Sequence, residues 1–110
     1  MKSQETGKEI INDIVQRIVR QFRPEKIILF GSYAKGDVNP DSDVDLLVIL
    51  PIEGSRRRKT VEIDLALVGV ELPVDLIVVT PEEVEKYRNK IGTIIRPAMN
   101  EGEVLYERTA

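Results

Sequence analysis

The run Asp43-Val-Asp-Leu-Leu-Val-Ile-Leu50 decides the fold of this chain. Its last five residues are all apolar, which is typical of a strand buried on both faces of a sheet. A second apolar run, residues 73–80 (PVDLIVVT), follows a segment of helical spacing, residues 55–68. A strand, a helix and a strand in this order predict two neighbouring parallel strands joined by a right-handed crossover. We expect the helix to bury one stripe made of Val61, Leu65 and Val68.

The remaining elements complete an α/β fold, with a mixed central sheet of three or four strands flanked by helices. The run KIILF, residues 26–30, predicts a strand, and it should run antiparallel to strand 43–50 so that Gly31-Ser32 reaches the acids. Thr80-Pro81-Glu82-Glu83 has the capping chemistry of a helix start. Further elements are expected over residues 8–22 (helix), 81–90 (helix), 93–100 (short helix) and 104–106 (edge strand).

Three aspartates should gather at one edge of this sheet. Asp43 and Asp45 open the first parallel strand on one face, and Asp75 lies at the start of the second. At an effective dielectric of about 20, two carboxylates about 4 Å apart repel by roughly 4 kcal/mol, and a divalent cation removes that cost. The chain has no His and no Cys, and an all-oxygen site of this kind suits Mg²⁺ rather than Zn²⁺.

A Gly-Ser turn should face these acids. Residues 31–36 (GSYAKG) predict one helical turn after the first strand, with Ser32 as N-cap and Gly36 as a left-handed C-terminal glycine. Free N–H groups at such a turn bind phosphate, and Lys35 adds a positive charge. Each motif alone is common: Gly-Ser can simply be a capped turn, and Asp37 and Asp41 are expected to be solvated loop acids. Residues 31–42 would cover the acids.

The composition predicts one domain over residues 1–110 and narrows its chemistry. A net charge of −3 lacks the basic footprint of a nucleic-acid binder. The absence of His and Cys excludes Ser-His and Cys-His nucleophile pairs and a thiolate metal site, and it favours a reducing cytoplasm. The polar residues 1–8 do not resemble a signal peptide, and no apolar run is long enough to span a membrane.

Two surface features are interpreted as structural. The basic run Arg56 to Lys59 predicts a solvated helix start, although a contact to nucleotide phosphate or to an acidic partner is the functional alternative. Tyr33, next to the Gly-Ser turn, is expected to be an exposed loop side chain.

Residues 31–48 (GSYAKGDVNPDSDVDLLV) closely resemble the signature of the nucleotidyltransferase superfamily that includes DNA polymerase beta. The form of the motif and the length of the chain are similar to the minimal nucleotidyltransferases, whose antitoxin branch is paired with helical HEPN-type toxins. This resemblance implies a nucleotide site at Gly31 and Ser32, two Mg²⁺ ions held by Asp43, Asp45 and Asp75, and help from Asp75 in deprotonating the attacking hydroxyl. It also implies ATP as substrate and a tyrosine hydroxyl of a HEPN-type partner as acceptor.

Two other interpretations remain open from the sequence. One is a nucleotidyltransferase that modifies a small molecule with the help of a second subunit, such as another copy of this chain. The other is a nucleotide-binding module without catalysis that neutralises its partner by contact. The presence of Asp43, Asp45 and Asp75 argues against the module without catalysis. In such a module, substitutions could remove these mutually repelling carboxylates without loss of function.

Overall fold

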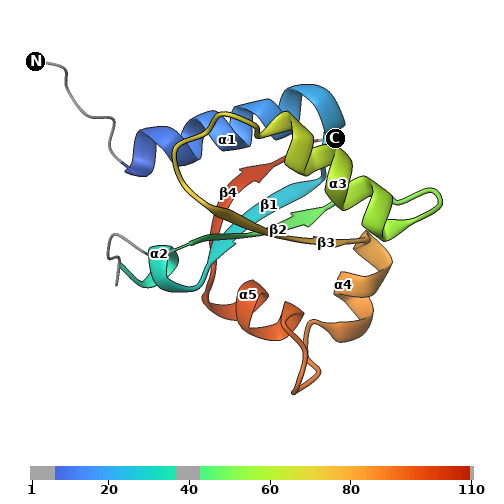
Figure 1. Cartoon of the computed structure of the whole chain (residues 1–110). Helices are drawn as coiled ribbons and strands as arrows, with labels where there is room; N and C mark the ends of the chain where they lie inside the picture. Colours follow the sequence, from blue (N-terminus) through green and yellow to red (C-terminus); the bar gives the residue numbers. More distant parts are fainter. Residues whose placement is uncertain (1–6, 37–42, 110) are drawn as a thin grey trace, which may run out of the picture.

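The computed structural model of the chain describes residues 7–36 and 43–109, and it has the expected α/β architecture. Four strands form one sheet in the order β3-β2-β1-β4 (Figure 1). The strands are β1 (Lys26–Phe30), β2 (Val44–Ile49), β3 (Val74–Val79) and β4 (Glu103–Glu107). The helices are α1 (Gly7–Phe22), α2 (Ser32–Lys35), α3 (Arg56–Ala66), α4 (Pro81–Tyr87) and α5 (Ile95–Glu101).

The directions of β1, β2 and β3 are those that the sequence predicts. β2 and β3 are parallel, with α3 as their crossover, while β1 is antiparallel to β2 and to β4. β1 therefore ends, and β2 and β3 begin, at the same edge of the sheet. This arrangement places the Gly-Ser turn and the starts of both acidic strands at one end of the molecule.

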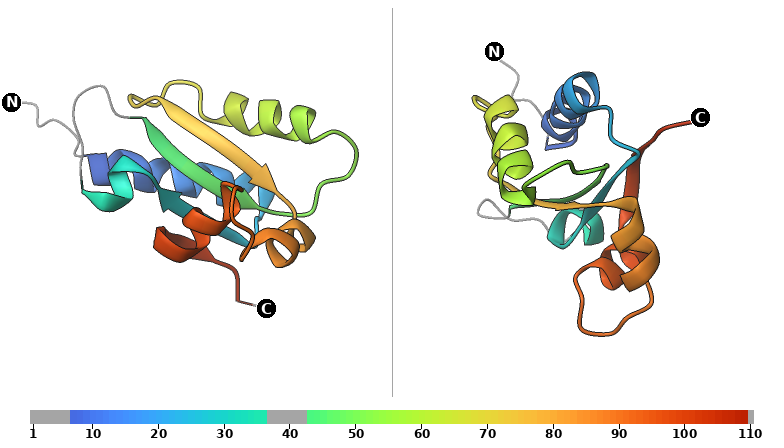
Figure 2. Two further views of the ribbon diagram at one scale, coloured as in Figure 1. Left: turned by 90° about the horizontal axis from the view of Figure 1, so that it is seen from below. Right: turned by 90° about the vertical axis from the view of Figure 1, so that its right-hand side faces the viewer.

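Helices cover both faces of the sheet, so the apolar runs are buried from two sides (Figure 2). On one face α1 and α3 pack over a core that includes Ile14, Leu46 and Ile63, all fully buried. On the other face α4 and α5 pack over a second cluster that includes Leu47 and Ala98. Within the described residues, no helix is both long enough and apolar enough to cross a bilayer.

One expectation about the core is wrong. Helix α3 forms where predicted, with the Ser55 side chain capping its start, but Val61, Leu65 and Val68 lie on its solvent side with exposures of 49%, 66% and 70%. Ile63 and Leu67 are the buried residues of this segment. Two apolar stripes compete on this helix, and the one with Ile63 packs with Leu76 and Val78 of β3 in the core.

Several boundaries differ slightly from the sequence expectation. Helix α4 has the predicted Thr80 cap with a full capping box, but it ends at Tyr87 rather than near residue 90. Helix α5 spans Ile95–Glu101 and edge strand β4 spans Glu103–Glu107, each within two residues of the expected range.

Candidate functional site at the edge of the sheet

Asp45 lies in the middle of a row that crosses three strands. Its Cα partner on β1 is Phe30, and its Cα partner on β3 is Asp75. Neighbouring strands lie about 4.8 Å apart, and residues in register point to the same face. Asp45 and Asp75 are therefore adjacent on the face that α4 and α5 cover further along the sheet. Asp43, two residues before Asp45, belongs to the same face by the alternation of the strand.

The charges of these three carboxylates act on one another. Burial raises the pKa of Asp45, and the negative charges of Asp75 and then Asp43 raise it further. Asp45 is half-buried, while Asp43 and Asp75 are exposed. The site thus has one carboxylate held within the fold and two that reach solvent, and it favours a cation.

The carboxylates fit Mg²⁺ by their chemistry, although they do not form a finished cage. Across residues 7–36 and 43–109, no group of three Asp or Glu side chains is arranged to hold one metal ion. Mg²⁺ is commonly held by one or two carboxylates together with substrate phosphates and water, so the pair Asp45 and Asp75 suffices as an anchor. That Asp43, Asp45 and Asp75 share metal ions stays a prediction.

Gly31 lies directly against Asp45. A Cβ atom built on Gly31 would stand 2.2 Å from Oδ2 of Asp45, and the φ of Gly31 is +76°, a conformation that side chains rarely adopt. Glycine is therefore required both by the backbone turn and by the nearby carboxylate. From the sequence, Gly31 is expected only as part of a nucleotide site. In the structure, the carboxylate of Asp45 also occupies the space that a side chain at position 31 would fill.

The turn that follows differs in one detail from the prediction. Gly31 occupies the N-cap position of α2, Ser32 is its first helical residue, and no side chain of the described residues caps this helix. Ser32 as N-cap is wrong, because the chain enters the turn through the positive φ of Gly31. Ser32 is exposed, so its hydroxyl remains available for a ligand. Gly36 has the predicted left-handed conformation, with φ +76°.

Helix α5 contributes residues that the sequence did not suggest. A small cavity of about 130 Å³ opens beside Gly31, and Lys35 is on its wall. The other lining residues come from β1, α2 and the α5 segment: Phe30, Ala34, Ile94, Pro97 and Glu101. Phe30 belongs to the same cluster as α5, so this cavity is on the face of Asp45. No motif marks Glu101, because its place depends on how α5 packs on the sheet.

Tyr33 points away from the acids. It is half-buried and packs against the core under α1, and a Cβ atom built on Gly7 would stand 3.4 Å from its ring. The expectation of an exposed loop tyrosine is wrong, because α1 extends far enough to cover it. Of the expected cover over the acids, residues 31–42, the second part, residues 37–42 with Asp37 and Asp41, lies outside the described residues.

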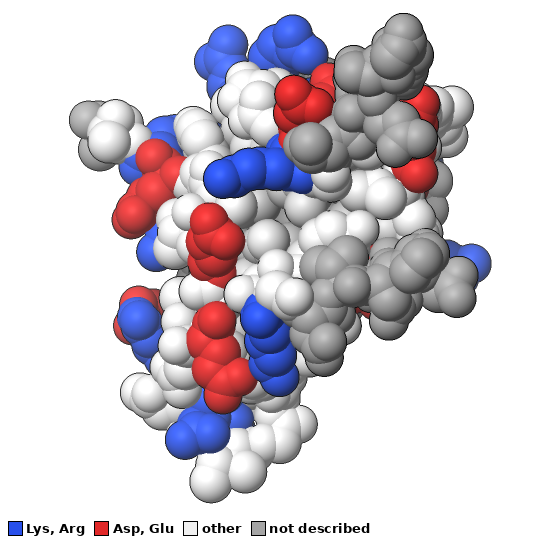
Figure 3. All heavy atoms as spheres, turned by 90° about the vertical axis from the view of Figure 1, so that its left-hand side faces the viewer, with Lys and Arg blue, Asp and Glu red and all other residues white. Residues whose placement is uncertain are grey.

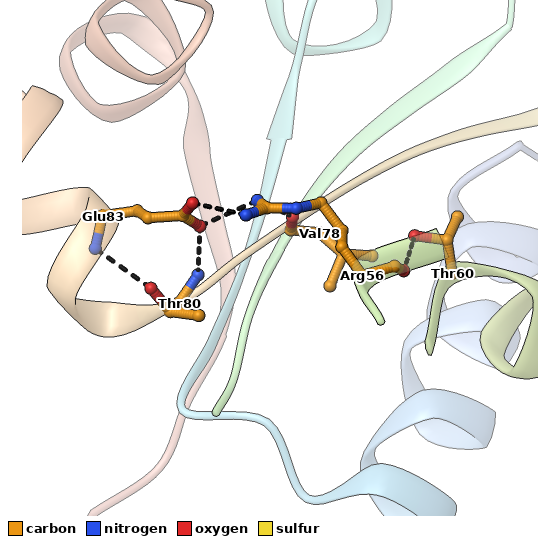
Figure 4. A network of polar contacts seen from close by, with 5 residues as sticks. All are labelled: Arg56, Thr60, Val78, Thr80 and Glu83. Atoms are coloured by element: carbon orange, nitrogen blue, oxygen red, sulfur yellow. Dashed lines mark hydrogen bonds and ion pairs between the residues drawn. The ribbon is translucent and has the colours of Figure 1, made fainter. Parts of the chain in front are cut away.

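The basic run at the start of α3 is only partly solvated. Arg56 donates to both carboxylate oxygens of Glu83, at 2.8 and 2.5 Å, and to the carbonyl of Val78 at 3.1 Å (Figure 4). Glu83 also accepts from the N–H of Thr80 at 2.9 Å. These contacts lower the pKa of Glu83 to about 2, chiefly through Arg56. Arg56 therefore ties α3 to β3 and α4, although it is exposed like Arg57 and Arg58.

Figure 3 shows the end of the molecule that carries α2. Positive and negative side chains of the described residues are interspersed over the visible face. This mixture agrees with the low net charge of the sequence.

Comparisons with known proteins point to one family. A family model described as "Nucleotidyltransferase domain" matches residues 9–99. A "Putative protein adenylyltransferase" of Methanocaldococcus jannaschii is 33% identical over 110 aligned residues, covering 96% of this chain and 100% of that protein. A second protein of the same description and organism is 41% identical over 44 residues, covering 38% of this chain and 44% of that protein.

Two solved structures share the fold. A "putative nucleotidyltransferase" from Sulfolobus solfataricus superposes with a TM-score of 0.63 at 22% identity, over 90% of this chain and 78% of that one. A chain from a structure described as a "toxin-antitoxin with AMP-PNP" superposes with a TM-score of 0.62 at 20% identity, over 89% of this chain and 74% of that one.

Proposed function

Because the chain belongs to the nucleotidyltransferase domain family, we propose that it transfers AMP from ATP to a tyrosine hydroxyl of a helical HEPN-type toxin and thereby acts as an antitoxin. The observation that carries the proposal is the row at the edge of the sheet, in which Gly31 lies against Asp45 and Asp45 is in register with Asp75. A phosphate turn and a pair of carboxylates side by side are the two parts that phosphoryl-type transfer requires.

Each residue has a role in this reaction. Gly31 and Ser32 hold the β- and γ-phosphates, and Lys35 adds a positive charge from the end of α2. Asp43, Asp45 and Asp75 hold two Mg²⁺ ions, which when bound neutralise the phosphates and favour ionisation of the attacking hydroxyl. Asp75 accepts the proton of that hydroxyl. The oxygen forms a bond to the α-phosphorus, the bond from that phosphorus to the bridging oxygen breaks, and pyrophosphate leaves.

Two comparisons support a protein acceptor. The M. jannaschii relative, similar over its whole length, is described as a protein adenylyltransferase, and one structure with the same fold belongs to a toxin-antitoxin complex with a nucleotide analogue. The site itself is consistent with an acceptor of some size, because Asp43 and Asp75 are exposed at the end of the sheet.

The proposal is tested with purified chain, Mg²⁺, ATP labelled on its α-phosphate, and the protein encoded next to this chain. We expect label on a tyrosine of that protein, loss of the label with Asp43→Asn/Asp45→Asn, and unchanged label with Asp64→Asn, an exposed acid on α3 used as control. Neutralisation of the partner without label, unaffected by the double substitution, would instead identify a contact-only antitoxin. Label that moves to a small hydroxyl compound and never to protein would identify a small-molecule transferase.

A further inference from the structure

One edge of the sheet is open next to the candidate site. Strand β3 is the outermost strand on its side, and its hydrogen-bonding groups alternate in direction. The N–H of Val44 donates to the Pro73 carbonyl at 2.9 Å, and the N–H of Leu50 donates to the Val79 carbonyl at 3.0 Å. The odd-numbered residues of β3 therefore face β2, and the backbone groups of Val74, Leu76 and Val78 point outward.

Within the part of the chain that the structure describes, a side chain blocks one end of this edge. Among contacts between described residues, the Val78 carbonyl accepts from Arg56 at 3.1 Å, while the backbone groups of Val74 and Leu76 have no such partner. The opposite edge strand is protected differently, since β4 has glutamates at both ends, Glu103 and Glu107. The unblocked part of β3 is thus the part that surrounds Asp75.

A groove of about 350 Å³ lies along the second half of this edge, from Leu76 to Val79. On one side its wall is formed by Arg56 and Thr60 of α3. On the other side the wall comes from the end of α4 and the start of α5, with Tyr87, Thr93, Ile94 and Ile95. In Figure 1, α3 lies above β3 and α4 lies below it. Residues Leu76 to Val79 of β3 line the groove between them.

We propose that the acceptor polypeptide binds as an extended segment paired with the β3 edge, which brings its hydroxyl to Asp75. This inference rests on the proposed function and adds where and in what form the acceptor is recognised. Outward N–H and C=O groups in a row require a partner with the same groups in the same spacing, and an extended backbone is the ligand that supplies them. From the N–H of Val74 to the N–H of Val78 the strand rises about 13 Å, enough for four or five residues of such a segment. Pairing would end there, because the carbonyl of Val78 already accepts from Arg56.

The walls of the groove also predict the sequence of the segment. A residue paired with Asp75 presents its side chain on the Asp75 face, and a residue two positions away lies on the same face beside Ile77. The groove near Ile77 is lined by Tyr87 and Ile94. An acceptor segment should therefore have an apolar residue two positions from its tyrosine, whereas the residues next to the tyrosine point to the opposite face.

Val74 offers a clean substitution. Its N–H points outward and is not used in the sheet, so Val74→Pro removes an outward donor and blocks the edge while leaving the bonds between β2 and β3 intact. Val74→Ala keeps the N–H and controls for the loss of the side chain. The probe is a set of short synthetic peptides, each with one central tyrosine and randomised flanking residues, incubated with the full chain, Mg²⁺ and labelled ATP.

We expect the wild-type chain and Val74→Ala to label the same peptides, and Val74→Pro to label them at least about tenfold more slowly. With the wild-type chain, N-methylation of a good peptide should abolish labelling at alternate amides only, because every second residue of an added strand bonds to the edge. This second measurement keeps the test valid if Val74→Pro fails to fold.

Other outcomes would overturn the inference. Labelling that is indifferent to Val74→Pro and to every N-methyl group would reject edge pairing and leave the proposed function intact. Labelling of the folded partner protein but of no peptide would show that the acceptor is recognised by its folded surface, and it would reject edge pairing as well. Absence of label on both peptides and partner protein would reject the proposed function, and this inference with it.

Discussion

Gly31 and Asp45 are so close that a methyl group on Gly31 would stand 2.2 Å from the carboxylate oxygen Oδ2 of Asp45. The Gly-Ser turn and the carboxylate of Asp45 are therefore in close contact, although fourteen positions of sequence separate them. A side chain at position 31 would displace the carboxylate from its present position.

We expect Gly31→Ala to abolish this arrangement. The new methyl group must push Asp45 away, and the φ of +76° adds strain, so stability should fall by about 1–3 kcal/mol and nucleotidyl transfer by at least tenfold. Gly36→Ala is the matched control, because Gly36 has the same φ of +76° but no atom of residues 7–36 or 43–109 lies within 4 Å of its built Cβ. It should cost about 1 kcal/mol and retain transfer. Equal losses of transfer in both variants would contradict the role of the Gly31 contact.

Asp45→Asn should stabilise the protein in a buffer that contains a metal chelator. Burial and the charges of Asp75 and Asp43 raise the pKa of Asp45, so its ionised form costs folding free energy. That cost appears as the pH rises from about 4 through the raised pKa, and it is fully present at neutral pH. Thermal unfolding at pH 7 should give a higher Tm for Asp45→Asn, and Mg²⁺ with ATP should raise the Tm of the wild-type chain only. A lower Tm for the variant without metal would contradict this account.

The pair of Arg56 and Glu83 predicts a loss of stability in acid. The pKa of Glu83 is lowered to about 2, so its contribution is present above the unfolded pKa near 4.5 and is lost as the pH falls toward 2. Because both side chains are partly exposed, we expect Glu83→Gln to cost only about 1 kcal/mol at pH 7 and nothing near pH 2. Urea unfolding at both pH values measures this. Glu82→Gln, an exposed acid in the same helical turn, serves as control and should change little.

The two apolar stripes of α3 should differ sharply in their effect on stability. Ile63 is fully buried, while Leu65 is 66% exposed. Ile63→Ala should reduce the free energy of unfolding by about 2–5 kcal/mol, and Leu65→Ala should change it by less than about 0.5 kcal/mol. Chemical denaturation of the isolated chain tests this directly. A large cost for Leu65→Ala would mean that this stripe is covered in solution.

Much of the fold follows from local sequence. The β-branched runs set the strands, Thr80 and Pro81 set the start of α4, and the strand-helix-strand order gives the parallel pair that brings Asp45 and Asp75 into register. What failed was the choice of buried face on α3. Val61 and Leu65 have the same spacing as Ile63 and Leu67, so the periodicity alone cannot decide which stripe meets β3.

The sequence analysis also did not predict the contacts between residues that are distant in the sequence. Arg56 and Glu83 are separated by 27 positions, and nothing in a run of four basic residues indicates that the first one turns toward α4. Tyr33 is half-buried because α1 extends over it, and Glu101 reaches the cavity beside Gly31 because α5 folds back on the sheet. These are consequences of packing between elements, for which a single sequence carries no local pattern.

The position of Asp75 in an edge strand has a consequence for solubility. Asp75 is the only charged residue of β3, whose other members are Val, Leu and Ile, and an uncharged apolar edge is a template for amyloid-like stacking. The carboxylate thus also acts as a gatekeeper against self-association. We expect Asp75→Asn, which removes one of the proposed metal-binding carboxylates, to increase light scattering at protein concentrations where Asp43→Asn stays clear. A variant intended to be inactive in cells is therefore better made at Asp43, because aggregation of an Asp75 variant could be mistaken for a loss of activity.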